Sequence, residues 1–312
     1  VRIKPSTHLS DRILIEEDVA VIARDGVRLS AKVYRPNKPG RFPVVMSFTA
    51  YGKDIGPDNY PALLDHALKP QFDLGPIDVS QWTTWEGPDP AFWVPNDYAV
   101  VYVDTRGYFS SEGKASILSE RDGEDFYDAI EWAGTQEWSN GNVGLNGVSY
   151  LAISQWVAAS TNPPHLKAII PWEGQTDAFR EVLYHGGIPE TAFTRMWIKK
   201  VNTGARNNPG PPKFLFEFAH NRQWLFQLIQ KPTGINLENI DVPALVCATW
   251  SDHGLHTRGS LEGFKQISSK EKWLFTHGRP KWSTYYSEEA LSFQKQFFDY
   301  YLKGENSGIK KV

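Results

Sequence analysis

A strand that runs directly into a serine and then into a helix constrains this chain most. The apolar run Val143–Leu145 predicts a buried strand, and Leu151–Ser160 predicts a helix close behind it. Ser149 lies at the turn between them, where a hydroxyl stands clear of the sheet, and Gly147 lets the backbone fold back tightly. We therefore predict that Ser149 is a nucleophile. An ordinary tight turn is the alternative, because Leu151 stands where such motifs usually have a second glycine.

Apolar strands alternate with helical segments along the chain. The predicted buried strands are Pro43–Thr49, Tyr98–Asp104, Val143–Leu145, Leu166–Pro171, Ala244–Thr249 and Trp273–Thr276. The predicted helices include Asp122–Thr135, Leu151–Ser160 and Ser287–Leu302. An opening hairpin, Ile13–Ala23 and Val27–Tyr34, is predicted to turn at Asp25-Gly26 in a type I′ turn. This alternation predicts an α/β fold with a mostly parallel sheet covered by helices on both faces.

Two segments interrupt the alternation. Gly56–Pro90 is long and shows no clear period, which is typical of a functional or poorly ordered loop. Gln175–Pro232 separates two predicted strands and contains a breaker at 207–212. Its helical pieces are Phe179–Tyr184, Thr191–Val201 and Lys213–Leu228. We expect a core of residues 1–172 and 241–312 that carries an inserted helical cap at 173–240.

Composition excludes several classes of function. Of the 312 residues, 41% are hydrophobic and 22% charged, which is typical of a globular protein. A net charge of −3, without a basic run, argues against nucleic-acid binding. The single Cys247 rules out an internal disulfide framework, and no apolar run reaches transmembrane length. We expect no membrane partner and a cytoplasmic location, and we leave a homodimer open.

A serine hydroxyl becomes a good nucleophile only beside a base. His277 directly follows a predicted strand and is the first choice among eight histidines, with His253 and His256 as rivals after another strand. The base needs an acid to orient it, and Asp252 follows the strand that begins at Ala244. The order Ser149, Asp252, His277 is the order expected of an α/β-hydrolase.

Donors for the oxyanion are expected next to these groups. The backbone amide of Tyr150, directly after the serine, is the first candidate. The second should come from the loop Ala50–Lys53, where either an amide or the Tyr51 hydroxyl could serve.

Several stretches spread over nearly the whole chain resemble one known family. They are Asp25-Gly26-Val27-Arg28-Leu29, Val33-Tyr34-Arg35-Pro36, Asp104-Thr105-Arg106-Gly107, Ser110-Ser111-Glu112-Gly113, Asp122-Gly123-Glu124-Asp125, Gly147-Val148-Ser149-Tyr150-Leu151 and Phe297-Phe298-Asp299-Tyr300-Tyr301-Leu302-Lys303-Gly304. Together they resemble the CocE/NonD hydrolases, which include cocaine esterase, X-Pro dipeptidyl-peptidases, α-amino acid ester hydrolases and glutaryl cephalosporin acylases.

The resemblance implies an α/β-hydrolase fold with a helical cap over the site. It implies Ser149, Asp252 and His277 as the triad, and Tyr51 with the Tyr150 amide as the oxyanion donors. The pocket side chains that we expect are Trp172, Trp82, Trp85 and His253. No cofactor and no metal site are expected.

The chain departs from the family pattern at two places. The family's C-terminal jelly-roll domain is expected to be absent from this chain, which stops at Val312. The loop His277-Gly278-Arg279-Pro280-Lys281-Trp282 differs from the Gly-Pro-Trp-x-His form of cocaine esterase.

We therefore expect a serine hydrolase of the carboxylesterase or acylase type, which acts on a small ester or amide through an acyl-enzyme. An X-Pro dipeptidyl-peptidase or an α-amino acid ester hydrolase is the alternative. A dipeptidyl-peptidase needs acidic groups for a free amine, and Glu173, Glu181 and Asp177 are the candidates. A non-catalytic protein that binds a small ligand is the alternative of another class. A connected Ser–His–Asp chain would argue against it.

Overall fold

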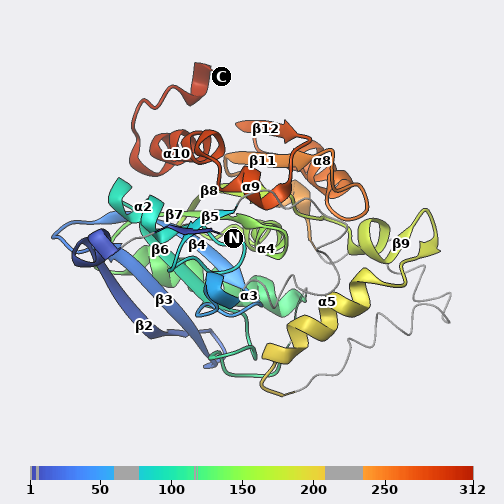
Figure 1. The fold of residues 1–312 in the computed structure, drawn as a ribbon, viewed down its shortest axis with the longest axis horizontal. Helices are drawn as coiled ribbons and strands as arrows, with labels where there is room; N and C mark the ends of the chain where they lie inside the picture. Colours follow the sequence, from blue (N-terminus) through green and yellow to red (C-terminus); the bar gives the residue numbers. More distant parts are fainter. Residues whose placement is uncertain are drawn as a thin grey trace.

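The computed structural model describes residues 2–4, 7–59, 77–115, 117, 119–207 and 235–311. Within them, an eight-stranded sheet crosses the centre of the molecule (Figure 1). In spatial order, its strands are β12 (Lys272–His277), β11 (Ala244–Thr249), β8 (Leu166–Trp172), β7 (Ser139–Val148), β4 (Phe42–Thr49), β6 (Ala99–Asp104), β3 (Arg28–Pro36) and β2 (Ile13–Ile22). Strands β12 to β6 pair in parallel, and β3 and β2 pair antiparallel. The predicted α/β fold with a mostly parallel sheet is confirmed.

Helices cover both faces of this sheet (Figure 1). Those of the described residues are α2 (Pro90–Trp93), α3 (Glu120–Thr135), α4 (Tyr150–Ala159), α5 (Phe193–Val201), α8 (Thr257–Gln266), α9 (Lys281–Tyr285) and α10 (Glu288–Lys303). The shorter helical turns are η1 (Thr7–Arg12), η2 (Pro57–Asn59), η3 (Val94–Asn96), the π-helical η4 (Phe179–Leu183), η5 (Asn202–Gly204), η6 (Leu237–Asn239) and η7 (Ile309–Lys311). The long predicted helices therefore form within a residue or two of their predicted bounds.

Strand β4 shows why its residues form a central strand. Every residue of Phe42–Thr49 is buried, as expected of a strand that is covered on both faces. Val44 and Phe48 pack in the cluster that contains α3 and α4, whereas Val45 packs in the cluster that contains α10. Successive side chains point to opposite faces of a strand, so one continuous apolar run serves both layers.

The opening hairpin forms as predicted, but its turn is different. Strands β2 and β3 pair from Ile13 to Ile22, and Gly26 has the positive φ of 84° that a tight turn needs. Asp25 does not have a positive φ, so the turn is not of type I′, which needs one at both central residues. The Asp25 carboxylate instead accepts a hydrogen bond from the Val27 amide at 3.2 Å. This side-chain contact closes a longer loop.

The segment between β8 and β11 adds smaller elements. It contains η4, the two-stranded ladder of β9 (Tyr184–His185) with β10 (Ile188–Pro189), and α5. Another short ladder joins β1 (Arg2–Lys4) to β5 (Asp78–Ser80). The predicted helix at 213–228, most of the breaker at 207–212 and much of the loop at 56–90 lie outside the described residues. The division into a core and a cap at 173–240 stays a prediction. No helix in the described part of the chain is long and apolar enough to span a membrane.

The parallel strands bring distant residues to one edge of the sheet. The carboxyl ends of β4, β7, β8, β11 and β12 lie at the same edge, because parallel neighbours all run in the same direction. The residues that follow these ends include Tyr51, Ser149, Glu173, Asp252 and Lys281. We therefore expect the candidate site at this edge of the sheet.

The packing of α3 on the sheet gives a stability prediction. The Phe126 ring stacks on Phe48 with 4.0 Å between centroids, and both residues are almost fully buried. Phe126→Ala should lower the free energy of unfolding by about 3–5 kcal/mol, as measured by urea denaturation. Glu124→Ala on the same helix is the control, since its exposed ion pair with Arg121 contributes at most about 0.5 kcal/mol. Equal losses in the two variants would contradict this packing.

Candidate active site

The turn at Ser149 is strained in the way that the sequence predicts. Ser149 has a positive φ of 58°, between the end of β7 and the start of α4. Gly147 has a φ of 149°, and a Cβ there would lie 2.5 Å from the Leu151 Cβ. The Ser149 amide donates to the Trp172 carbonyl at 3.1 Å, which ties the strained residue to β8. The backbone therefore presents the serine side chain at the carboxyl edge of the sheet.

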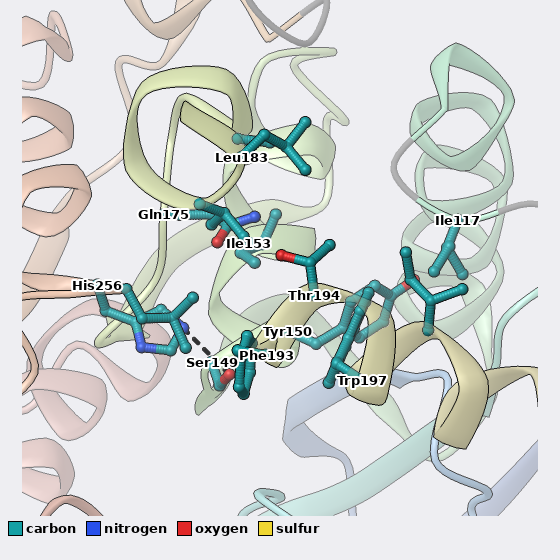
Figure 2. Close-up of a pocket in the computed structure, with 14 residues that line it drawn as sticks. Ile117, Ser149, Tyr150, Ile153, Gln175, Leu183, Phe193, Thr194, Trp197 and His256 are labelled. Carbon is teal, nitrogen blue, oxygen red and sulfur yellow. Dashed lines mark hydrogen bonds between the residues drawn. The ribbon is translucent and has the colours of Figure 1, made fainter. Parts of the chain in front are cut away.

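The serine hydroxyl belongs to a connected chain of hydrogen bonds. Ser149 Oγ lies 3.2 Å from Nε2 of His256, and the dashed line in Figure 2 marks this contact. His256 Nδ1 lies 2.5 Å from Oδ2 of Asp252. His256 is buried, and its side chain is only 2% exposed. A serine, an imidazole and a carboxylate in this order can transfer the serine proton to the imidazole, because the carboxylate stabilises the cation that forms.

His277, the first choice from the sequence, is not at the serine. Its Nε2 lies 3.0 Å from Glu173 Oε1, and its Nδ1 accepts a hydrogen bond from the Arg279 amide at 3.2 Å. Its ring stacks on Trp172. The expectation that His277 contacts Ser149 is therefore wrong in this structure, and the rival His256 occupies that place. The physical reason is that His277 is still the last residue of β12 and points into the core.

Asp252 has a second partner that the sequence did not indicate. Lys281 Nζ, at the start of α9, lies 2.5 Å from Asp252 Oδ2 and 2.9 Å from His256 Nδ1. Burial alone would raise the pKa of the Asp252 carboxyl. The adjacent Lys281 and His256 outweigh burial and lower that pKa. The Asp252 carboxyl is therefore deprotonated at neutral pH.

Tyr51 lies beside the serine from the loop after β4. Its hydroxyl accepts a hydrogen bond from Trp197 Nε1 at 3.1 Å, and the side chains of Ser149 and Glu86 also act on its pKa. Burial, followed by the nearby Glu86, raises the pKa of Tyr51 well above its ordinary value, so the hydroxyl keeps its proton. The Tyr150 amide begins α4 and has no partner within that helix. Both predicted donors thus lie next to Ser149.

A cavity opens above Ser149 (Figure 2). Its volume is about 60 Å³. The described residues that line it are Ile117, Ser149, Tyr150, Ile153, Gln175, Ala178, Val182, Leu183, Phe193, Thr194, Trp197, Ile198, Leu255 and His256. Most of these side chains are apolar, and many come from the segment between β8 and β11. The described walls of the cavity are therefore built largely by the segment between β8 and β11.

The pocket residues expected from the sequence lie elsewhere. Trp172 is fully buried in the core, where it packs against Phe275 and His277. Trp85 packs against Trp282 with 5.2 Å between ring centroids, and Trp82 packs on the same core cluster. His253 is exposed. None of these four is among the described residues that line the cavity.

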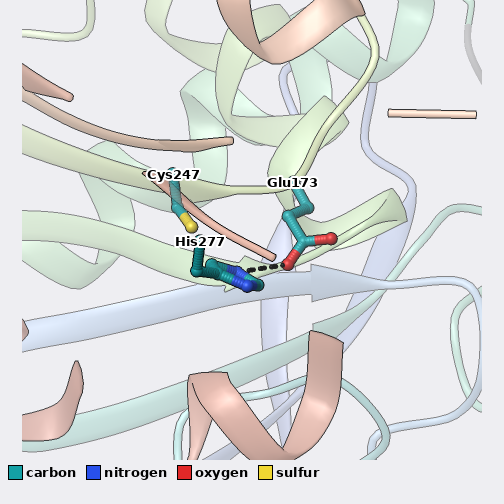
Figure 3. A group of neighbouring side chains, drawn as sticks. All are labelled: Glu173, Cys247 and His277. Carbon is teal, nitrogen blue, oxygen red and sulfur yellow. Dashed lines mark hydrogen bonds and ion pairs between the residues drawn. The ribbon is translucent and has the colours of Figure 1, made fainter. Parts of the chain in front are cut away.

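One group of side chains has the donor types of a metal site (Figure 3). Glu173, Cys247 and His277 each offer one ligand atom, and these atoms lie within 4.8 Å of one another. His277 Nε2 is hydrogen-bonded to Glu173, and burial raises the pKa of the Cys247 thiol well above its ordinary value. Two of the three candidate ligand atoms, His277 Nε2 and Glu173 Oε1, therefore already have each other as a partner.

The acidic candidates for holding a substrate amine are all occupied. Glu181 accepts the Thr176 amide at 2.8 Å and pairs with Arg258 at 2.7 Å. Asp177 pairs with Arg180. Glu173 pairs with His277. None of the three lies on the described wall of the cavity.

The fold and the strand-to-helix serine turn define an α/β-hydrolase. Residues 25–225 match the family described as X-Pro dipeptidyl-peptidase (S15 family), and this match spans more than half of the chain. The chain therefore belongs to this family of serine hydrolases, which confirms the relationship to the CocE/NonD hydrolases.

Individual relatives agree with this placement. A CocE/NonD family hydrolase of known structure from Staphylococcus aureus is 50% identical, with a TM-score of 0.87 over 96% of this chain and 52% of that chain. Cocaine esterase from Rhodococcus sp. is 27% identical, and the match covers 96% of this chain and 57% of the esterase. An aminopeptidase from a Thaumarchaeota archaeon, at 16% identity and a TM-score of 0.65 over 98% of this chain and 57% of that chain, shares the fold. The chain spans about half the length of these relatives.

The strained turn makes a testable demand on Gly147. Gly147→Ala should lower the free energy of unfolding by about 1–3 kcal/mol, because its Cβ meets Leu151 and its φ is unfavourable for alanine. Chemical denaturation measures this loss. Gly278→Ala is the matched control, since nothing lies within 4 Å of a Cβ at that position. A variant at 147 that is as stable as the control would show that the turn is not strained.

Proposed function

We propose that this chain hydrolyses small, uncharged carboxylic esters through an acyl-enzyme on Ser149. In this proposal His256 is the general base, Asp252 is the acid that orients it, and Tyr51 and the Tyr150 amide bind the oxyanion. The observation that carries the proposal is the chain of contacts from Ser149 Oγ to His256 Nε2 at 3.2 Å and from His256 Nδ1 to Asp252 at 2.5 Å.

The reaction then follows from the positions of the protons. Ser149 Oγ attacks the ester carbonyl carbon while its proton passes to His256 Nε2, and the carbonyl oxygen becomes an oxyanion. When the tetrahedral intermediate collapses, the C–O bond of the ester breaks, and His256 returns the proton to the leaving alcohol. Water then attacks the acyl carbon while His256 takes a proton from it. The bond to Ser149 Oγ breaks, His256 returns the proton to Ser149, and the carboxylic acid is released.

Two observations support the proposed oxyanion donors. The Tyr51 hydroxyl stays protonated because burial raises its pKa, and it borders both Ser149 and the cavity residue Trp197. A fixed donor that needs no reorganisation stabilises a developing negative charge better than water does. The first amide of α4, at Tyr150, supplies the second donor.

The cavity supports a short, neutral acyl group. Its described walls are mostly apolar. His256 is the one residue among them whose side chain can change its charge near neutral pH. A volume of about 60 Å³ suits a short chain, since a single water occupies roughly 10–15 Å³ on this scale. A free ammonium would lose its hydration there, and none of the described wall residues offers it a carboxylate.

This wall chemistry weighs against the alternatives. X-Pro dipeptidyl-peptidases and α-amino acid ester hydrolases act on substrates with a free α-amine, and the acidic residues Glu173, Glu181 and Asp177 are already paired with basic side chains. A purely ligand-binding role would not need a buried histidine between a serine and a carboxylate. An esterase accounts for both observations.

The identity of the base can be tested directly. His256→Ala should lower kcat for an ester by about 10⁴-fold or more, since loss of a triad base costs this much in serine hydrolases. His277→Gln keeps a hydrogen-bonding group beside Glu173 and should lower kcat by no more than about 100-fold. Steady-state kinetics and labelling with a fluorophosphonate probe give the readouts, and Ser149→Ala should not be labelled. A greater loss from His277→Gln than from His256→Ala would return the base to His277.

The substrate class is tested with a matched panel. The p-nitrophenyl ester of butyrate should be cleaved with a kcat/KM at least about 10³-fold above that of an Ala-Pro p-nitroanilide, because the described walls of the cavity hold no carboxylate to pair with the ammonium of the dipeptide. The p-nitrophenyl ester of glycine, which carries the same leaving group and a free amine, separates the effect of charge from that of the amide bond. Faster cleavage of the anilide than of the butyrate ester would overturn the proposed class.

A further inference from the structure

Lys281 is a largely buried cation in direct contact with the proposed acid and base. Its side chain is 12% exposed, and Nζ lies 2.5 Å from Asp252 Oδ2, 2.9 Å from His256 Nδ1 and 4.0 Å from Glu173 Oε2. It belongs to α9, whereas Asp252 and His256 follow β11 and Glu173 follows β8. Glu86, in the loop before α2, also acts on Lys281 by its charge. The catalytic role assigned to Ser149, His256 and Asp252 does not use this lysine.

We propose that Lys281 is a positioning residue for the ester hydrolysis described above, on which this inference rests. It fixes the Asp252 carboxylate against His256, and its charge keeps His256 unprotonated, and hence able to act as a base, at acidic pH.

The geometry explains the positioning. Oδ2 of Asp252 accepts from both His256 Nδ1 and Lys281 Nζ, so the carboxylate is held by the turn after β11 and by the start of α9. The ammonium is also within 2.9 Å of His256 Nδ1 and would donate to it if the ring carried its proton on Nε2. Nε2 would then be unable to accept the serine proton. Asp252 instead accepts hydrogen bonds from both His256 Nδ1 and Lys281 Nζ. Nδ1 therefore keeps its proton, and Nε2 stays free to act as the base.

The charges around His256 act in the same sense. Burial first, and then the positive charge of Lys281, lower the pKa of His256, whereas Asp252 and Glu173 raise it. Burial alone would lower the pKa of Lys281 as well. The three acidic neighbours Asp252, Glu173 and Glu86 overcome this effect and raise it, so the ammonium persists. A fixed positive charge beside the imidazole disfavours protonation of that imidazole.

Glu173 supplies a second acidic side chain beside Lys281, and His277 holds it there. Glu173 has a positive φ of 53°, and its amide donates to the Cys247 carbonyl at 3.0 Å. One carboxylate oxygen, Oε1, is hydrogen-bonded to His277 (Figure 3). The other, Oε2, lies 4.0 Å from Lys281 Nζ. The buried Glu173–His277 pair thus holds a carboxylate beneath the ammonium. This gives His277 a place in the site although it does not reach the serine.

Three substitutions at one position separate charge from hydrogen bonding. Lys281→Arg keeps both, Lys281→Gln keeps a donor without charge, and Lys281→Met removes both. The acid limb of the pH profile of kcat/KM reports the protonation of the free base. We expect this limb to move to higher pH in Lys281→Gln and Lys281→Met, because His256 then gains its proton more easily, and to stay near its wild-type position in Lys281→Arg.

The rate at high pH measures positioning alone. Above the limb, kcat should fall roughly 10- to 100-fold in Lys281→Met and less in Lys281→Gln, which still donates to Asp252. Arg279→Gln is the matched control, since it removes a positive charge from the same loop but its side chain faces the exposed Glu289. Its limb and its kcat should match the wild type. If Lys281→Met does not fold, the comparison of the Gln and Arg variants still decides the question.

The outcomes distinguish this inference from the proposed function. An acid limb at the wild-type pH in Lys281→Gln, with the wild type active and Ser149 labelled by a fluorophosphonate, would overturn the role of Lys281 alone. A wild type that hydrolyses no ester and is not labelled at Ser149 would overturn the proposed function itself. An equal shift of the limb in Arg279→Gln would show a general effect of surface charge and would also reject the inference.

Discussion

The largely buried carboxylate of Asp252 joins the segments that build the candidate site. Its backbone carbonyl accepts hydrogen bonds from the amides of Leu255, His256 and Thr257, so the chain turns back and brings the His256 ring beside the carboxylate. Lys281, at the start of α9, reaches the same oxygen. A buried carboxylate is very costly without such partners. Asp252 therefore keeps the ends of β11 and β12 in one arrangement, and through His256 this arrangement extends to Ser149.

The end of a predicted strand determines where a residue lies in the sheet but not where its side chain points. The sequence therefore predicts only part of this site. The strained turn at Ser149, the loop position of Asp252 and that of Tyr51 follow from apolar runs, since parallel strands end at one edge. The direction of a side chain there does not follow. His277 completes β12 and turns into the core, whereas His256 lies four residues after Asp252 in a helical turn. The Asp-x-x-x-His spacing was the available signal, because residues four apart in a helical turn face each other.

The cavity was less predictable for a different reason. Aromatic residues suit both a core and a pocket, and a count of them cannot distinguish the two. Trp172 and Trp85 fill the core around the ends of the strands, whereas the walls of the cavity include Phe193 and Trp197 of α5. Which aromatic residues face a cavity depends on how the inserted segment folds over the sheet. That depends on tertiary contacts, and it cannot be predicted from the spacing of apolar residues in α5.

The acidic side chains around Lys281 explain how a lysine beside the base stays compatible with proton transfer. Asp252, Glu173 and Glu86 act on Lys281 by their charge and raise its pKa, so the ammonium persists. The same ammonium lowers the pKa of His256, whereas Asp252 and Glu173 raise it. In the proposed mechanism, the lysine therefore opposes protonation of the resting base, while the acidic neighbours offset the cost of the imidazolium that forms when His256 takes the serine proton.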